Sequence, residues 1–261
     1  MGAYLALRRG RRVLAIDMDP QGQLGKVFAV EVHRQRRSAI DLLLDSLLED
    51  PLETPPGSNP APESAGALPV VPTRIRGLDL IVANKALAVF PAWNGADADA
   101  DPTGRLQRTL NGAPELADYD FVFMDAPPSF GPLTLNVLRA AEEVVIPVPL
   151  TYLALDGCAE LERTLASVRS RYHNPGLRIS LVVPTFYRRT RLAHEMLERL
   201  SSRFPKTLAQ TVVGFHVKID EAQSKGRSIF EHAPRSRGAQ AMAALAEELE
   251  LRNPLEEAPQ Q

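Results

Sequence analysis

Two short apolar runs, each followed at once by aspartate and proline, most constrain the fold of this chain. Phe121–Met124 has four apolar residues without polar alternation, and Asp125 follows it ahead of two prolines. Val13–Ile16 repeats the pattern ahead of Asp17 and Asp19. Apolar runs this short, with turn residues after them, are typical of strands buried on both faces of a parallel sheet.

The carboxylates at the ends of these two strands predict a ligand site. In open α/β sheets, ligands bind in the crevice beyond the carboxyl ends of the strands. Asp17 and Asp19 are two residues apart, so in an extended strand they share a face and address one site. The alternative for Asp125, taken alone, is an aspartate that caps the next turn. The second copy of the pattern favours the site.

Strand and helix patterns alternate along the rest of the chain. This order predicts an α/β fold with a mostly parallel central sheet and helices on both faces. The further expected strands are Leu78–Ala83, Glu143–Pro149, Arg178–Val183 and Thr211–Phe215. The expected helices are Met1–Arg9, Ala39–Leu48, Arg105–Leu116, Leu155–Tyr172, Glu195–Phe204 and Ala239–Leu251. We expect one domain over residues 1–251, a flexible insertion at 51–72 that holds seven of the 22 prolines, and a disordered tail at 252–261.

Composition excludes several classes of function. The net charge is −2 at pH 7, so a role in nucleic-acid binding needs a local basic patch. The single cysteine, Cys158, excludes an internal disulfide and fits a reducing cytoplasm. The sequence contains no run of about 18 apolar residues, the length that would predict a membrane span. The five histidines show no ligand pair at helical or strand spacing, so no zinc site is expected.

Longer stretches around the aspartates resemble the ParA/Soj partition ATPases, a deviant Walker branch of the P-loop NTPases in the MinD/ParA superfamily. The similarity runs through IDMDPQGQ, FMDAPPSFGPLTLN, VVIPVPLTYLALDG and VKIDEAQSKGRSIFEHAPRSRGAQA, in the family's order. It covers about residues 2–250. The resemblance implies a P-loop NTPase-like fold, ATP and Mg²⁺ as cofactors, and a role in plasmid partition or chromosome segregation.

The resemblance also implies roles for single residues near the nucleotide. It implies that Asp125 holds Mg²⁺, that Asp17 supports the metal region and that Asp19 positions the attacking water. These roles suit phosphoryl transfer, which needs a metal on the phosphate oxygens and an oriented nucleophile. The residues implied to lie beside the nucleotide are Gln21, Pro127, Phe215 and Val217. Gly214 and His216 depart from the proline and asparagine usual in the adenine-side segment.

Basic residues late in the chain resemble the family's DNA-binding positions. The resemblance implies that Arg189, Arg191 and Lys218 bind DNA without sequence preference, once two ATP-bound subunits have formed a homodimer. Such contacts go to phosphates and weaken with salt. It also implies association with the nucleoid and a ParB-like partner that stimulates hydrolysis. The alternative is that these residues form a solvated charged face.

One motif of the family is missing from the printed sequence. No GxxxxGK[ST] segment occurs, although this loop supplies the N–H cradle, the lysine and the hydroxyl that hold phosphates and Mg²⁺. We therefore expect that Met1 is not the natural start, and that a strand and phosphate loop precede it. The family places that strand at the centre of the sheet, where three or four buried side chains contribute about 5–12 kcal/mol.

Two functions therefore stay open. The complete gene product would be an ATPase, whereas a degenerate relative would be a non-enzymatic DNA- or partner-binding module. The chain as printed is expected to hydrolyse little ATP, because it lacks the phosphate-loop lysine.

Overall fold

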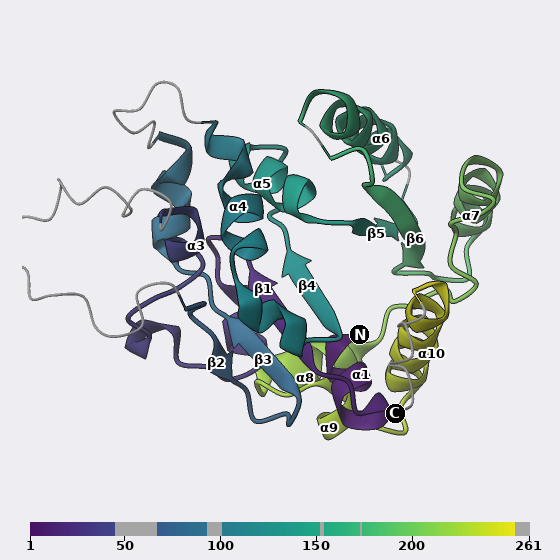
Figure 1. Ribbon diagram of the computed structural model, residues 1–261. Helices are drawn as coiled ribbons and strands as arrows, with labels where there is room; N and C mark the ends of the chain where they lie inside the picture. Colours follow the sequence, from purple (N-terminus) through teal and green to yellow (C-terminus); the bar gives the residue numbers. More distant parts are fainter. Residues whose placement is uncertain (45–66, 93–100, 152–153, 173, 254–261) are drawn as a thin grey trace, which may run out of the picture. The chain divides into compact units, whose positions relative to one another are not determined.

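The computed structural model describes residues 1–44, 67–92, 101–151, 154–172 and 174–253. The chain divides into two compact units (Figure 1). One unit is Gly10–Ala141, and the other consists of Met1–Arg9 together with Glu142–Gln261. They are called here the β1 unit and the β5 unit, after the first strand of each.

The β1 unit is built on a four-stranded sheet in the order β2-β3-β1-β4. Its strands are β1 (Val13–Asp17), β2 (Val71–Pro72), β3 (Leu78–Ile81) and β4 (Phe121–Asp125). β1 pairs in parallel with β3 and with β4, whereas β2 runs antiparallel to β3. All five residues of β1 are buried, as expected for a strand with parallel neighbours on both edges.

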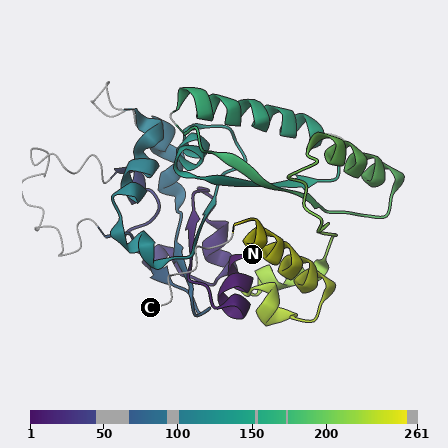
Figure 2. The ribbon, with the colours of Figure 1, turned by 45° about the vertical axis from the view of Figure 1, so that its right-hand side comes forward.

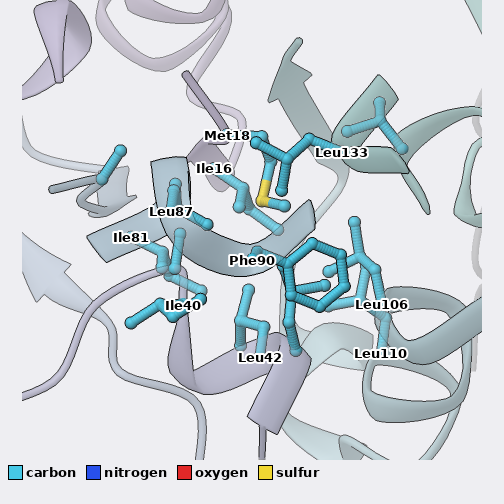
Figure 3. Close-up of a cluster of buried hydrophobic side chains, with 14 of the residues drawn as sticks. Ile16, Met18, Ile40, Leu42, Ile81, Leu87, Phe90, Leu106, Leu110 and Leu133 are labelled. Atoms are coloured by element: carbon cyan, nitrogen blue, oxygen red, sulfur yellow. The ribbon is translucent and has the colours of Figure 1, made fainter. Parts of the chain in front are cut away.

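Short helices pack against this sheet and form one apolar core with it. The helices are α2 (Gln23–Val27), α3 (Asp41–Leu44), α4 (Arg105–Asn111) and α5 (Pro132–Ala140), with 3₁₀ turns at η1 (Val32–Arg34), η3 (Lys85–Ala92), η4 (Pro102–Gly104) and η5 (Pro114–Asp118). Figure 3 shows the core, in which Ile16 and Met18 from the β1 segment lie with Leu42 of α3, Leu106 of α4 and Leu133 of α5. The β1 strand is thereby fixed, and its carboxyl end is positioned.

The β5 unit contains a second sheet, of two parallel strands. β5 (Glu143–Pro149) pairs with β6 (Arg178–Thr185), with a bulge at Val144/Val145. Its helices are α1 (Gly2–Arg9), α6 (Ala154–Arg171), α7 (Arg191–Arg203), α8 (Val217–Ser224), α9 (Ile229–His232) and α10 (Arg237–Arg252). Figure 2 shows α6 along β5 and α1 beside α10, where Arg9 Nε donates to Glu250 Oε2 at 2.7 Å.

The predicted α/β class is confirmed, with strand pairing that is parallel except for β2 with β3. The burial predicted for Phe121–Met124 is wrong, because all four residues are only half-buried. Among the described residues, β4 pairs with β1 alone and therefore forms the edge of its sheet. An edge strand has no neighbour to cover its second side, so its apolar side chains keep part of their exposure.

Four predicted elements differ most from the structure, and one of them, the helix predicted over Glu195–Phe204, is the longer α7 that begins at Arg191. Thr211–Phe215 is not a strand: Gly214 makes only an isolated bridge with Tyr187. The helix predicted over Arg105–Leu116 ends at Asn111, because Gly112 and a proline two residues later stop it. The helix predicted over Ala39–Leu48 begins at Asp41, and residues 45–48 lie outside the described part.

The two segments predicted to be irregular are described only in part. Residues 51–66 of the predicted insertion lie outside the described residues, while its last two residues form β2 because Val71 pairs with Leu80. Residues 254–261 of the predicted tail also lie outside them. Arg252 is the last residue of α10, and Asn253 is its C-cap.

Candidate functional site

The carboxyl ends of β1 and β4 lie directly beside each other. Asp17 is the register partner of Asp125, the last residue of each strand being opposite the other. The chain then stays paired for one more step, because the Met18 N–H donates to the Asp125 carbonyl at 2.9 Å. The two aspartates singled out from separate sequence motifs are thus brought to one place.

Asp17 is fully buried and holds the turn that follows β1. Its Oδ1 accepts from the Asp19 N–H at 3.1 Å, and its Oδ2 accepts from the Leu24 N–H at 3.0 Å. Burial raises the pKa of the Asp17 carboxyl to about 6, and the negative charges of Asp125 and Asp19 add to the rise against the effect of the backbone hydrogen bonds. Both carboxylate oxygens accept hydrogen bonds from the protein's own backbone, so Asp17 stabilises the turn.

Asp19 and Gln21 form the turn that Asp17 holds. Asp19 is half-buried, and its Oδ1 accepts from the Gln21 N–H at 2.9 Å. Gly22 follows with φ 60°, and a Cβ at this position would lie 3.0 Å from the Ala83 carbonyl oxygen. The prediction that Asp17 and Asp19 share one strand face is wrong, because β1 ends at Asp17 and Asp19 lies beyond it, where its carbonyl accepts from the Gly22 N–H of the turn at 2.9 Å.

Asp125 presents an exposed carboxylate at the end of β4. Desolvation by the surrounding chain, and then the negative charge of Asp19, raise the pKa of this carboxyl. Pro127 follows half-buried, and its carbonyl accepts from Thr134 Oγ1 at 3.4 Å. Thr134 Oγ1 also donates to the Ser129 carbonyl, so the first turn of α5 holds the segment after Asp125.

Asp19 and Asp125 fit an Mg²⁺ site in which the phosphates of a bound nucleotide supply further ligands. Mg²⁺ at such sites takes one or two protein carboxylates, keeps several waters and binds substrate phosphates. Asp125 is exposed and suits this role, with Asp19 beside it. Within the described ranges, no group of three or more metal-ligating side chains gathers. The aspartates therefore form no closed metal cage of their own.

The other predicted site residues belong to the β5 unit. Phe215 lies just before α8, and Val217 is its first residue; both side chains are exposed. Arg189 lies between β6 and α7 and is exposed, while Arg191 begins α7 with its side chain 94% exposed and an ion pair to Glu195 at 3.0 Å. The bridge between Tyr187 and Gly214 connects the segment that contains Arg189 with the segment that contains Phe215.

Lys218 is exposed on α8 and is paired within that unit. Its Nζ lies 2.7 Å from Glu221 Oε2, and the same oxygen is 3.2 Å from His232 Nε2. The hydrogen bonds from Lys218 and His232 hold the pKa of the Glu221 carboxyl below its usual value. Lys218 can reach a phosphate only by exchanging this partner or sharing it.

Sequence reasoning did not single out Phe186. This residue follows β6 directly, is 58% exposed and has a φ of 53°, in the left-handed region that aromatic residues seldom occupy. Its only signal in the sequence is an aromatic residue directly before the basic segment YRRTR.

Known proteins resemble this chain over nearly its whole length. The sequence matches the AAA domain family over residues 1–179. It is 38% identical over 253 residues to the chromosome-partitioning ATPase Soj of Thermus thermophilus, covering 97% of this chain and 88% of that protein. The chain belongs to the Soj/ParA family of partition ATPases. The sporulation initiation inhibitor protein Soj of Bacillus subtilis is 33% identical over 255 residues, covering 95% of this chain and 90% of that protein.

A solved structure extends the Soj/ParA comparison to a nucleotide complex. Cobyrinic acid a,c-diamide synthase from Mycobacterium smegmatis, with bound ATP analog and magnesium, superposes with a TM-score of 0.70 at 29% identity. The match covers 94% of this chain and 84% of that chain. The family resemblance seen in the motifs is thus confirmed, while a strand and phosphate loop ahead of Met1 stay a prediction. None of the described helices has the length and apolar character needed to cross a bilayer.

Proposed function

We propose that this protein is a cytoplasmic, nucleoid-associated partition ATPase of the Soj/ParA type. In this proposal it forms a homodimer with ATP, the dimer binds DNA without sequence preference, and a ParB-like partner stimulates hydrolysis and release. The process would segregate a chromosome or a plasmid.

The observation that carries the proposal is the acidic end of β1 and β4 in a chain of this family. Asp125 is in register with Asp17, and the turn that contains Asp19 is held against them by backbone hydrogen bonds. Asp125 would ligate Mg²⁺ on the nucleotide phosphates, and Asp19 would orient the attacking water. Gln21 and Pro127 stand at this end and would lie near the nucleotide.

The proposed DNA contacts come from the exposed cations of the β5 unit. Arg189 makes no ion pair with any residue in the described part of the chain, and Arg191 projects from the start of α7. With Lys218 they supply contacts to phosphates, which carry no sequence information. Each lost phosphate contact should lower the slope of log K against log salt by about 0.9 on duplex DNA.

The second candidate is a non-enzymatic module that binds DNA or a partner. One observation favours it, because no GxxxxGK[ST] segment occurs in the printed sequence. The two candidates differ in what they require of the aspartates. An ATPase depends on Asp19 and Asp125, whereas a module that only binds DNA does not.

A test of both candidates introduces substitutions at the gene's own locus and follows a fluorescent fusion together with chromosome or plasmid loss. Asp125→Ala should make the protein diffuse, because Mg-ATP no longer supports the dimer. Asp19→Ala should leave it on the nucleoid and raise loss, because release needs hydrolysis. If both variants distribute and segregate like the wild type, the ATPase proposal fails.

The DNA-binding step is tested with the same readout and with purified protein. Arg189→Ala with Lys218→Ala should disperse the fusion and reduce the salt slope on duplex DNA by about 1.8. Arg163→Ala with Lys206→Ala is the matched control, since it removes the same charge from two other exposed positions of the β5 unit. Equal behaviour of the two double variants would contradict the assignment.

A further inference from the structure

Two exposed phenylalanines lie side by side in the β5 unit. Phe186 follows β6 and is 58% exposed, and Phe215 precedes α8 and is 45% exposed. Their ring centroids are 6.3 Å apart, with an angle of 35° between the rings. We call this pair the aromatic platform. Two large rings left open to solvent together indicate a contact surface, since each would gain free energy by burial.

Backbone contacts fix the aromatic platform in place. Tyr187 and Gly214 form a parallel bridge, and the Tyr187 N–H donates to the Val213 carbonyl at 3.2 Å. Phe186 is held with a φ of 53°, which a bulky residue adopts only where its surroundings require it. The two rings are therefore arranged before any ligand arrives, so binding orders little of the chain.

Positive charge lies next to the aromatic platform. The guanidinium carbon of Arg188 lies 5.2 Å from the Phe215 ring centroid, within cation–π range. Arg189 is exposed on the same loop. Arg191 and Lys218 follow close in sequence to the two phenylalanines, each with one glutamate partner. Rings and cations in this arrangement complement a polyanion that also carries flat aromatic groups.

We propose that the aromatic platform stacks unpaired bases of single-stranded DNA while the neighbouring cations contact its phosphates. This inference rests on the proposed DNA-binding function and names a substrate class for the same surface. Duplex DNA hides its base faces inside the stack and can use only the cations. A single strand offers both its phosphates and its bases, and each base stacked on a protein ring adds to affinity regardless of sequence.

The experiment measures fluorescence anisotropy of the purified chain with Mg-ATP present, because the proposed DNA-binding form is the ATP-bound dimer. The probe is an oligothymidine of about 20 nucleotides, longer than the ~4–16 nucleotides that one binding fold occupies. A duplex of equal length is measured in the same buffer. Phe186→Leu keeps an apolar side chain but removes the ring face. It should weaken single-strand binding by about 5- to 150-fold, the loss expected for one stacked base, and change duplex binding less than twofold.

Matched variants separate stacking from general effects. Phe186→Trp should retain or increase single-strand affinity, because a larger ring stacks better. Leu251→Ala removes an apolar side chain that is 82% exposed on α10 and should leave both affinities unchanged. Phe215→Leu should repeat the selective loss seen with Phe186→Leu. Circular dichroism verifies the fold of each variant, and Phe215→Leu decides the question if Phe186→Leu does not fold.

The outcomes separate this inference from the proposed function. Duplex binding that depends on Arg189 and Lys218, with no effect of either leucine variant on the single strand, would overturn the inference and leave the function standing. Equal weakening of both DNA forms would also overturn it, since the rings would then serve the duplex. Binding of ATP through Phe186 without binding of oligothymidine would show an adenine site instead. Failure to bind either DNA with Mg-ATP present would refute the DNA-binding function itself.

Discussion

Asn136 should be among the most sensitive polar positions of the β1 unit, although it performs no chemistry. It lies in α5, at the end of the motif FMDAPPSFGPLTLN, and is fully buried. Its Oδ1 accepts from the Leu106 N–H at 3.1 Å, and its Nδ2 donates to the carbonyls of Pro102 and Pro132 at 2.9 Å each. Because the N-cap of α4, Gly104, has no side-chain hydrogen bond, Asn136 supplies a cap from another helix.

The cost of Asn136→Ala follows from these three bonds. Leu106 is fully buried, so its N–H would lose its partner without gaining water, at about 1–3 kcal/mol. The two donated bonds contribute about 1 kcal/mol each. The total is about 3–5 kcal/mol, which for a protein of this size lowers Tm by about 6–20 °C. Asn111→Ala, at an exposed position of α4, is the control and should change stability by less than about 0.5 kcal/mol.

Urea denaturation followed by circular dichroism measures the free energy of unfolding of both variants. Hydrogen exchange of the Leu106 amide reports the missing cap directly, because an amide without its acceptor exchanges faster. If Asn136→Ala unfolds within about 1 kcal/mol of Asn111→Ala, or if the Leu106 amide stays protected, the capping argument is refuted.

Three further predictions concern other contacts. Thr190→Ala removes the N-cap of α7, which accepts from an amide at 3.2 Å, and should cost about 1 kcal/mol in thermal denaturation; a change within error would show that the cap contributes nothing. Burial opposes ionisation of Asp101, but hydrogen bonds from Arg139 and Thr103 outweigh it and lower its pKa to about 2. Because the pKa of Asp101 is lower in the folded state, its ionised carboxylate stabilises the fold at pH values above the unfolded-state pKa of about 4, and this stabilisation is lost as the pH falls towards 2. Asp101→Asn should therefore reduce the loss of stability between about pH 4 and pH 2, and an unchanged loss would contradict the prediction. Ile16→Val, in the core, should cost about 0.5–1.5 kcal/mol in urea, and a stabilised variant would show that Ile16 is overpacked.

The sequence predicts best where a pattern depends on neighbours along the chain. Val13–Ile16 is a continuous apolar run and forms a buried strand. The helical spacing of apolar residues over 239–251 predicts a helix, and this range lies within α10. The predicted helix over Arg105–Leu116 missed the stop at Gly112, although glycine with a proline two residues later is a local stop signal. Local propensity and burial act together at these positions.

Predictions failed where the outcome depends on a distant partner. The residues of β4 are as apolar as those of β1, but β4 is an edge strand among the described residues and stays half-buried. Thr211–Phe215 has the composition of a strand, yet its pairing with the end of β6 and Tyr187 amounts to an isolated bridge at Gly214 and two backbone hydrogen bonds of Val213. Neither the edge position of β4 nor the limited pairing of Thr211–Phe215 can be predicted from the residues of the segment alone. The platform at Phe186 was missed for the same reason, since its second ring lies 29 positions further along the chain.

The residues of the two family motifs IDMDPQGQ and FMDAPPSFGPLTLN divide into those that build the site and those that remain available to a ligand. Asp17 and Asn136 are fully buried, with their polar atoms bound to the protein's own backbone. Asp19 and Asp125 are accessible and stand at the end of the same two strands. Substitution of a buried member therefore lowers activity through folding, whereas substitution of an accessible one should change stability little. Loss of segregation in Asp19→Ala or Asp125→Ala with unchanged stability would thus locate the chemistry, and the same loss in Asn136→Ala would not.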